Sequence, residues 1–205
     1  MAASILQGLS FPAEVSAAEI DAAAGKVVSA TNCTVEGVAK KDGGISFTRL
    51  DGALPFFPAD AASILPHAPL LEELNDYRLK VTGLAAGKYA LHIGGKPVGE
   101  FTSEQLAAGT NIAAAALSSG PIAEQSNAVK AAVERKNQYH HDQIFRGIVL
   151  SGVPGWVYEV VPKAELEEKK AALINDRLAK LPAMDAEIAK ALEMKANTFE
   201  LVPVK

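Results

Sequence analysis

The stretch Tyr77-Arg-Leu-Lys-Val-Thr82 alternates between apolar and polar residues along its whole length. Tyr77, Leu79 and Val81 fall on one face of an extended chain, because successive side chains of a strand lie on opposite faces. The stretch Lys88-Tyr-Ala-Leu-His-Ile93 repeats this pattern. The sequence therefore predicts two strands here, each with one buried face.

The segments between and after these strands predict a meander. Gly83-Leu-Ala-Ala-Gly87 is typical of a hairpin loop, and Gly94-Gly95 accepts the positive φ values of a tight turn. The chain then returns through residues 98–102, and Pro97 favours an edge strand because proline donates no ladder hydrogen bond. We therefore expect three antiparallel strands in sequence order.

Upstream of the meander the pattern predicts more strands. Residues 26–38 and 44–50 are rich in Val, Ile and Thr, and a Lys-Lys-Asp-Gly-Gly turn separates them. Residues 15–24 fit either an Ala-rich helix with a capping box or a strand. Residues 54–72 contain several prolines, so we expect a connection with a short helix at most.

Thr102 and Gln105 can cap a brief helix that ends before Gly109. After about residue 120 the apolar period changes from 2 to 3.6, which indicates helices. A helix is predicted over residues 121–145, with Pro121 at its start, and a second over residues 163–181. Pro182 interrupts this stripe, which continues to about residue 192. The tail after Phe199 is extended.

The predicted fold class is therefore α+β, a small antiparallel β-sheet domain followed by long amphipathic helices. We divide the chain into the end of a helix at 1–10, a β-rich domain at 11–115 and a helical region at 116–205. Met1, Ile5 and Leu9 share one helical face, which needs a partner surface because nine residues are too short for a stable isolated helix.

Composition excludes several classes of protein. The 205 residues are 49% hydrophobic, which excludes global disorder. The 20 basic and 24 acidic residues give no general reason to expect nucleic acid as a partner. No window has the length and hydropathy of a membrane span, so we predict no membrane partner.

Chemistry is indicated mainly by what the sequence lacks. It contains no Gly-x-Ser-x-Gly, His-Glu-x-x-His, Walker-type or dinucleotide-binding motif. Cys33 is the single cysteine and lies in a strand-like run, where a buried or half-buried structural thiol is expected. We therefore assign no catalytic residue, no cofactor-binding residue and no metal ligand.

Four sequence features are not explained by the predicted strands and helices. The histidines His67 and His92 fit a loop and a solvent-facing strand position. His140-His141-Asp142 diverge around a helix by about 100° per residue, so they do not converge on one ion. Trp156 is expected to fill the junction between helix and loop, with anchoring of a sugar or a protein partner as the alternative. A basic and aromatic cluster fits a packing and salt-bridge surface; it consists of Arg135, Lys136, Tyr139 and Arg146.

Several stretches together resemble one family. Met1-Ala-Ala-Ser-Ile-Leu-Gln-Gly-Leu9 resembles the last helix of an SGNH/GDSL-type esterase domain. The region from Tyr77 to Phe101 is similar to a C-terminal extension that a bacterial branch of these hydrolases carries. The match continues through three further segments, which are Gln105-Leu-Ala-Ala-Gly-Thr-Asn-Ile-Ala113, Glu134-Arg-Lys-Asn-Gln-Tyr139 and Phe199-Glu-Leu-Val-Pro203.

The resemblance implies an ester hydrolase with acyl esters of carbohydrates as its expected substrates, but it covers only the part downstream of the catalytic domain. The Gly-Asp-Ser segment, the Gly and Asn oxyanion donors and the Asp-x-x-His segment of the family are absent. We therefore expect a non-catalytic C-terminal portion whose partner is the SGNH domain of the same polypeptide. The alternative is a self-standing module that binds a glycan or a protein.

Overall fold

The computed structural model describes the backbone of residues 2–204, and their side chains except at positions 2, 3, 59, 60 and 62. The chain forms two compact units, one made of residues 1–126 and 194–205 and the other of residues 127–193. Each unit is described by itself below. This division differs from the predicted one, because residues 194–205 return to the first unit.

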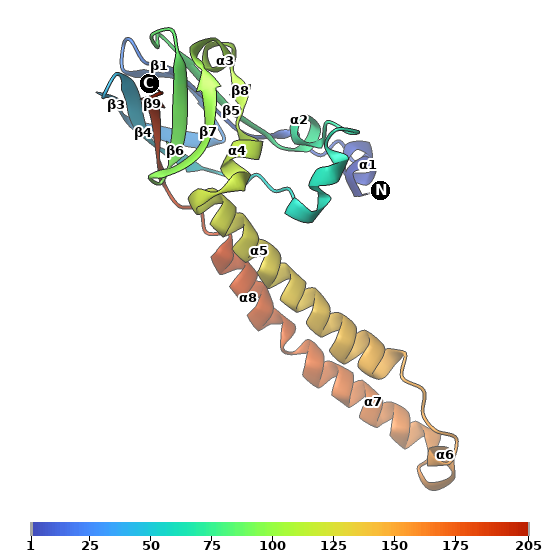
Figure 1. The fold of residues 1–205 in the computed structure, drawn as a ribbon. Coiled ribbons are helices and arrows are strands. Elements are labelled where there is room, and N and C mark those ends of the chain that lie inside the picture. The colour runs from blue at the N-terminus through green and yellow to red at the C-terminus, as the bar shows by residue number, and fades with distance from the viewer. Residues whose placement is uncertain (1, 205) are drawn as a thin grey trace. The chain divides into compact units, whose positions relative to one another are not determined.

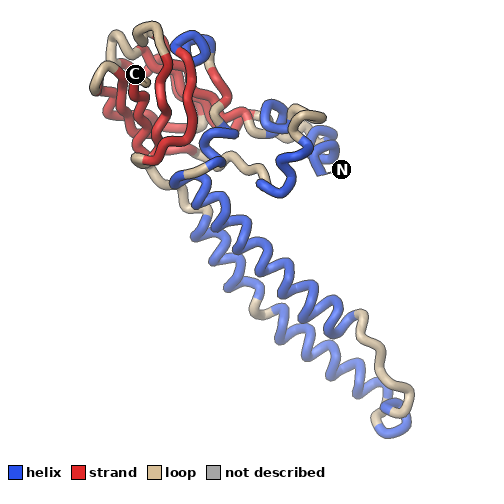
Figure 2. The backbone as a smooth tube through the Cα atoms, viewed as in Figure 1, coloured by secondary structure: helices blue, strands red, loops and turns tan. Residues whose placement is uncertain are grey.

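The first unit contains two sheets, drawn red in Figure 2. The first sheet has the strand order β2-β1-β5-β8, with β1 at Glu14–Asp21, β2 at Lys26–Thr31, β5 at Asp76–Thr82 and β8 at Thr110–Asn111. The second has the order β3-β4-β9-β6-β7, with β3 at Cys33–Lys41, β4 at Gly44–Asp51, β6 at Lys88–Ile93, β7 at Lys96–Thr102 and β9 at Asn197–Pro203. Figure 1 shows the strands with these labels.

The predicted meander is wrong in its pairing. Strands β6 and β7 form the expected antiparallel hairpin, and β7 with Pro97 is an edge strand as predicted. Strand β5, however, pairs parallel with β1 and belongs to the other sheet. The segment Gly83–Gly87 therefore crosses between sheets. Alternation identifies the buried face of a strand but does not identify its neighbour, which explains the error.

Because alternation does not identify the neighbour of a strand, the structure also differs from the prediction upstream of β5. The predicted strand at 26–38 is divided at Asn32, whose φ is 51°. Strand β2 pairs with β1 in the first sheet, whereas β3 pairs with β4 in the second. The ambiguous segment 15–24 is a strand, β1, rather than a helix.

The core lies between the inward faces of the two sheets. Tyr77, Leu79 and Val81 are fully buried on β5, which confirms the face predicted from alternation. The partner faces come from β1, β4, β6 and β9, and their buried apolar residues include Ile20, Phe47, Leu91, Phe199 and Leu201. Phe47 and Phe199 stack with their ring centroids 5.4 Å apart.

Five short helices complete the first unit. They are α1 at Ala2–Gly8, the 3₁₀ helix η1 at Ala59–Ile64, α2 at Leu70–Leu74, α3 at Ser103–Ala108 and α4 at Ala113–Ser118. Helix α3 begins with the predicted capping box, in which Thr102 Oγ1 accepts from the Gln105 backbone and Gln105 Oε1 accepts from the Thr102 backbone. The predicted fold class α+β is confirmed.

The second unit is a helical hairpin. Helix α5 (Gly120–Tyr139) enters it from the first unit and is followed by the π-helix η2 (His140–Val149) and α6 (Val157–Val160). Helices α7 (Lys163–Leu178) and α8 (Leu181–Ala191) form the returning side. Arg135 pairs with Glu187 at 3.3 Å and Lys136 pairs with Asp185, so α5 and α8 are joined by ion pairs as expected for a salt-bridge surface.

The chain is helical over the whole predicted range 121–145, but the helix changes from α to π after Tyr139. From His140 the helix widens to i→i+5 hydrogen bonds, and Leu150 N donates to Phe145 O over 2.8 Å. Gly147 permits this widening, because a Cβ at that position would lie 2.7 Å from the Asp142 carbonyl oxygen. Arg177 on α7 donates to the Gln143 carbonyl oxygen of the same turn.

Candidate functional site

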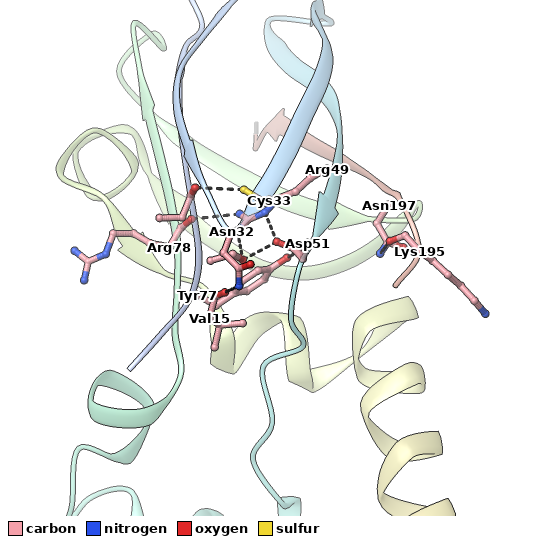
Figure 3. Close-up of polar contacts among 11 residues, drawn as sticks. Val15, Asn32, Cys33, Arg49, Asp51, Tyr77, Arg78, Lys195 and Asn197 are labelled. Carbon is pink, nitrogen blue, oxygen red and sulfur yellow. Dashed lines mark hydrogen bonds and ion pairs between the residues drawn. The ribbon is translucent and has the colours of Figure 1, made fainter. Parts of the chain in front are cut away.

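A polar cluster that the sequence did not predict lies between the two sheets of the first unit (Figure 3). Arg49 on β4 donates from Nε to Asp51 Oδ1 at 2.7 Å and from Nη2 to Ser16 Oγ at 2.7 Å. Ser16 Oγ in turn donates to Asp51 Oδ1 at 2.6 Å, and Tyr77 Oη donates to Asp51 Oδ2 at 2.7 Å. Arg49 also donates to the Arg78 carbonyl oxygen, so it joins the two sheets.

This cluster contains a hydroxyl group and a carboxylate but cannot act on a substrate. Ser16, Arg49 and Tyr77 have no exposed surface, and Asp51 is 6% exposed. The Arg49 guanidinium lies 4.3 Å from the centre of the Tyr77 ring, and the Tyr77 hydroxyl bonds to Asp51. Burial raises the pKa of Tyr77 well above its ordinary value, so the phenol stays protonated. The cluster therefore serves to hold the sheets together.

Sequence alternation carried a signal for this cluster. Ile45 and Phe47 predict the inward face of β4, and the same period places Arg49 and Asp51 on that face. Two charged residues that continue a buried face predict a buried ion pair, because an unpaired charge would be too costly there.

Cys33 lies at the edge of the cluster as a half-buried thiol, which confirms the prediction for this residue. Its Sγ donates to the Ala17 carbonyl oxygen at 3.3 Å. Burial is the main cause that raises the pKa of the Cys33 thiol, and Arg49 opposes this effect. A raised pKa disfavours the thiolate, so Cys33 is a poor nucleophile.

An apolar groove lies beside this polar cluster in the same unit. Its volume is about 720 Å³, and Val15 and Asn32 belong to its wall. Asn32 Nδ2 donates to the Val15 carbonyl oxygen at 2.6 Å, which fixes one polar group of the wall. Asn75 Oδ1 accepts from the Phe56 backbone at 2.7 Å and fixes another. The apolar side chains of the wall come mainly from the N-terminal segment and the proline-rich connection, and include Leu6, Phe11, Leu54, Phe56, Phe57, Ile64, Leu70 and Leu74.

Large apolar side chains around the groove are also exposed. We name this set the N-terminal apolar surface, and it consists of Ile5 (56% exposed), Leu9 (73%), Phe11 (54%), Phe56 (46%) and Ile64 (46%). Leu6 of helix α1 lines the groove, whereas Ile5 of the same helix and Leu9, which follows its end, are in contact with solvent. Met1, the third residue of the predicted stripe, lies outside the described residues. An apolar surface of this kind marks an interaction site more often than a catalytic one.

The histidines do not form a site. His67, His140 and His141 are exposed, and His92 is half-buried on β6. His141 Nδ1 lies 2.9 Å from Asp142 Oδ1, and this hydrogen bond is the main cause that lowers the pKa of Asp142. Among the described residues, no group of three or more His, Cys, Asp or Glu side chains converges as a metal site. None of the helices in the described range has the length and hydropathy needed to cross a membrane.

Trp156 does not fill the junction between helix and loop, and the interpretation as a core residue is wrong. Its side chain is 65% exposed at the end of the helical hairpin. The nearby Ile144 and Ile148 are buried instead, each 4% exposed. These isoleucines are the buried residues of η2.

Comparison with known proteins gives one likeness of fold. No family profile matches the chain, and no curated protein matches it. The chain is similar to the solved structure of a gut microbial diltiazem-metabolizing enzyme, with a TM-score of 0.72 and 23% sequence identity. The likeness covers 98% of this chain and 52% of that chain, so this chain spans about half the length of that enzyme. At this identity the likeness shows a shared fold.

Proposed function

We propose that this chain is the non-catalytic C-terminal portion of an SGNH/GDSL-type ester hydrolase, and that its N-terminal apolar surface packs against the hydrolase domain of the same polypeptide. The observation that carries the proposal is the exposure of Ile5, Leu9 and Phe11 beside an apolar groove. Burying such side chains is worth about 1.5–3 kcal/mol each, so a partner that covers them stabilises the unit.

Two further observations support the choice of partner. The segment 1–9 resembles the last helix of the esterase domain, and this segment is α1, which forms part of the N-terminal apolar surface. The structure with the same fold is described as an enzyme, and 52% of its chain is matched here. Its remaining part has no counterpart in this chain, which leaves room for a separate catalytic domain.

Hydrolysis itself is then assigned to the other domain. The 205 residues lack the Gly-Asp-Ser and Asp-x-x-His segments that supply nucleophile and base in this family. Ser16, although hydrogen-bonded to Asp51, is enclosed by the two sheets. The complete polypeptide would act on acyl esters of carbohydrates.

The reading frame upstream of Met1 provides the first test, because the proposal requires it to encode both missing segments. The complete polypeptide is expected to hydrolyse p-nitrophenyl acetate, whereas the 205-residue chain shows no turnover above background. Turnover by the 205-residue chain that survives repurification, and is lost on one Ser→Ala or His→Ala change, contradicts the proposal.

Phe56→Asp tests the surface itself. Phe56 is 46% exposed, so the new carboxylate is expected to leave the Tm of the 205-residue chain unchanged. In the complete polypeptide it would be buried against the hydrolase domain and lower the Tm by several degrees. Val28→Asp is the matched control, because Val28 is 57% exposed on β2 outside this surface and should lower neither Tm.

The exposed Trp156 favours a second candidate, a self-standing module that binds a glycan, since indole rings stack on sugars. Trp156 is the only tryptophan of the chain, so its fluorescence reports binding directly. Saturable quenching or a blue shift on titration with cellohexaose or xylohexaose would favour this candidate. If the chain is instead the C-terminal portion of a hydrolase, we expect no change in Trp156 fluorescence on this titration.

A further inference from the structure

The second unit carries an apolar patch of its own. We name it the arm tip, residues 145–160, and its large exposed side chains are Phe145 (42%), Val149 (47%), Leu150 (62%), Trp156 (65%), Tyr158 (47%) and Val160 (69%). In Figure 1 this segment includes α6, at the end of the hairpin where α7 begins.

These side chains are not needed for the packing of the hairpin. On η2 the inner positions Ile144 and Ile148 are buried, and the exposed Phe145 and Val149 each follow one of them. In the following loop, a Cβ added at Gly152 or Gly155 would meet no atom within 4 Å, so this part of the loop has no close packing. Because exposed aromatic clusters are rare on isolated domains, the arm tip indicates an interface. Tryptophan and tyrosine are also the residues most enriched in interface hot spots.

The charges of the arm tip limit the class of partner. Between 145 and 160 the sequence has only two charged residues, Arg146 and Glu159, which are of opposite sign. Peripheral binding to an anionic membrane relies on a cluster of basic residues beside the apolar side chains, and this cluster is absent. Nucleic acid is disfavoured for the same reason. The partner is therefore an uncharged apolar protein surface.

The area of the arm tip indicates whether its partner is a separate molecule or a part of the same polypeptide. Six large side chains of this exposure offer about 600 Å² of surface. A stable complex between separate molecules buries about 800 Å² from each partner, so a dimer formed through the arm tip alone would be weak. A partner on the same polypeptide can bind through a smaller buried area, because the covalent link raises its effective concentration to the millimolar range.

We propose that the arm tip contacts the hydrolase domain of the same polypeptide, with Trp156 and Tyr158 as its central contacts. This inference rests on the proposed function, which supplies that domain, and adds a contact separate from the N-terminal apolar surface. The matched part of the structural neighbour covers 98% of this chain, so the hairpin also occurs in a larger enzyme.

Acrylamide quenching of Trp156 tests the proposal. In the 205-residue chain the indole is 65% exposed, so its emission should be quenched readily. In the complete polypeptide the Trp156 contribution, obtained by difference from Trp156→Phe, should show a quenching constant several-fold lower. Cleavage by elastase in the segment 149–153 should also be slower in the complete polypeptide than in the 205-residue chain.

Variants separate the arm tip from the rest of the hairpin. Leu150→Asp should restore strong quenching of Trp156 in the complete polypeptide, whereas Leu173→Asp, an exposed position on α7, should not. Equal quenching and equal cleavage in the 205-residue chain and the complete, active hydrolase would overturn this inference and leave the proposed function standing. An upstream reading frame without a hydrolase domain would instead end the proposed function.

The other partners give distinct results with the 205-residue chain alone. A blue shift of Trp156 emission on adding phosphatidylcholine–phosphatidylglycerol vesicles would assign the arm tip to a membrane and contradict the proposal. A blue shift that rises with protein concentration, together with a dimer in sedimentation equilibrium, would assign it to a second copy and contradict it equally.

Discussion

Arg49 and Asp51 lie two residues apart on β4, and Arg49 Nε donates to Asp51 Oδ1 at 2.7 Å in the space between the two sheets. Arg49 has no exposed surface, and Asp51 is 6% exposed. The pair also contacts Ser16 and Tyr77 of the other sheet. The two sheets are thus joined by a charged contact as well as by apolar packing.

Removing one member of this pair should be costly. Arg49→Met leaves the Asp51 carboxylate enclosed without its cation and should lower the free energy of unfolding by about 3–5 kcal/mol. Urea unfolding followed by far-UV circular dichroism measures this. Lys169→Met is the control, because its pair with Glu165 is exposed and should contribute nothing measurable. A loss equal to that of the control would show that Asp51 does not need Arg49.

Tyr77 predicts a dependence of stability on alkaline pH. Its raised pKa means that the folded chain keeps a proton that the unfolded chain releases above about pH 10. Stability from this group is therefore complete below that pH and decreases as the pH rises above it. Tyr77→Phe should cost about 1–2 kcal/mol at pH 7, because the bond to Asp51 is lost. Its unfolding free energy should then fall less steeply above pH 10 than that of the wild type.

Cys33 should react slowly with thiol reagents. Its pKa is raised by burial, so the rate of reaction with iodoacetamide should reach half its plateau at a pH above 9.0. The 205-residue chain unfolded in urea serves as the control and should reach half its plateau at a lower pH. A faster reaction in the folded chain at pH 8 would contradict the buried-thiol interpretation.

Gly44 is required by the contact between β4 and β9. A Cβ at Gly44 would lie 1.7 Å from the Leu201 carbonyl oxygen, so Gly44→Ala must displace backbone in the middle of the second sheet. We expect a loss of about 3 kcal/mol or more in the free energy of unfolding. Gly152→Ala, where an added Cβ meets nothing within 4 Å, is the matched control and should change it little.

Helix α1 should exchange its amide hydrogens quickly in the 205-residue chain. Ile5 and Leu9 are exposed, so few apolar contacts hold the seven-residue helix. Hydrogen exchange should be fast at residues 3–7 and slow at residues 79–81, which lie in the buried strand β5. Strong protection of residues 3–7 in a dilute monomer would remove the physical argument for a missing partner of α1.

Local features of this fold are readable in the sequence. Alternation identified the buried faces of β5 and β6, because a strand exposes every second side chain. The capping residues Thr102 and Gln105 identified the start of α3 for a similarly local reason. The pairing of strands was not readable, since β1 contacts β5 across about 60 residues of chain, as in the pair Ile20 and Val81.

The candidate sites were less accessible to sequence reasoning. The groove combines α1 with a proline-rich connection that has no periodic pattern, so the sequence does not predict which side chains meet. The stripe predicted in the N-terminal segment did not identify the groove either, because Ile5 and Leu9 are exposed and Leu6 lines the groove. Trp156 was assigned to the core because aromatic residues usually lie there. Trp156 is instead 65% exposed, and the π-helix that precedes its loop is likewise not predicted by a helical period of 3.6.

The position of β9 has a consequence for synthesis on the ribosome. This strand fills the gap between β4 and β6, and its Glu200 pairs with Lys41 from 159 residues earlier in the chain. Until residues 197–203 emerge, the nascent chain presents the unpaired edges of β4 and β6, and such edges are prone to pair with other chains. The second sheet can therefore close only late in translation, after the helical hairpin has already been made.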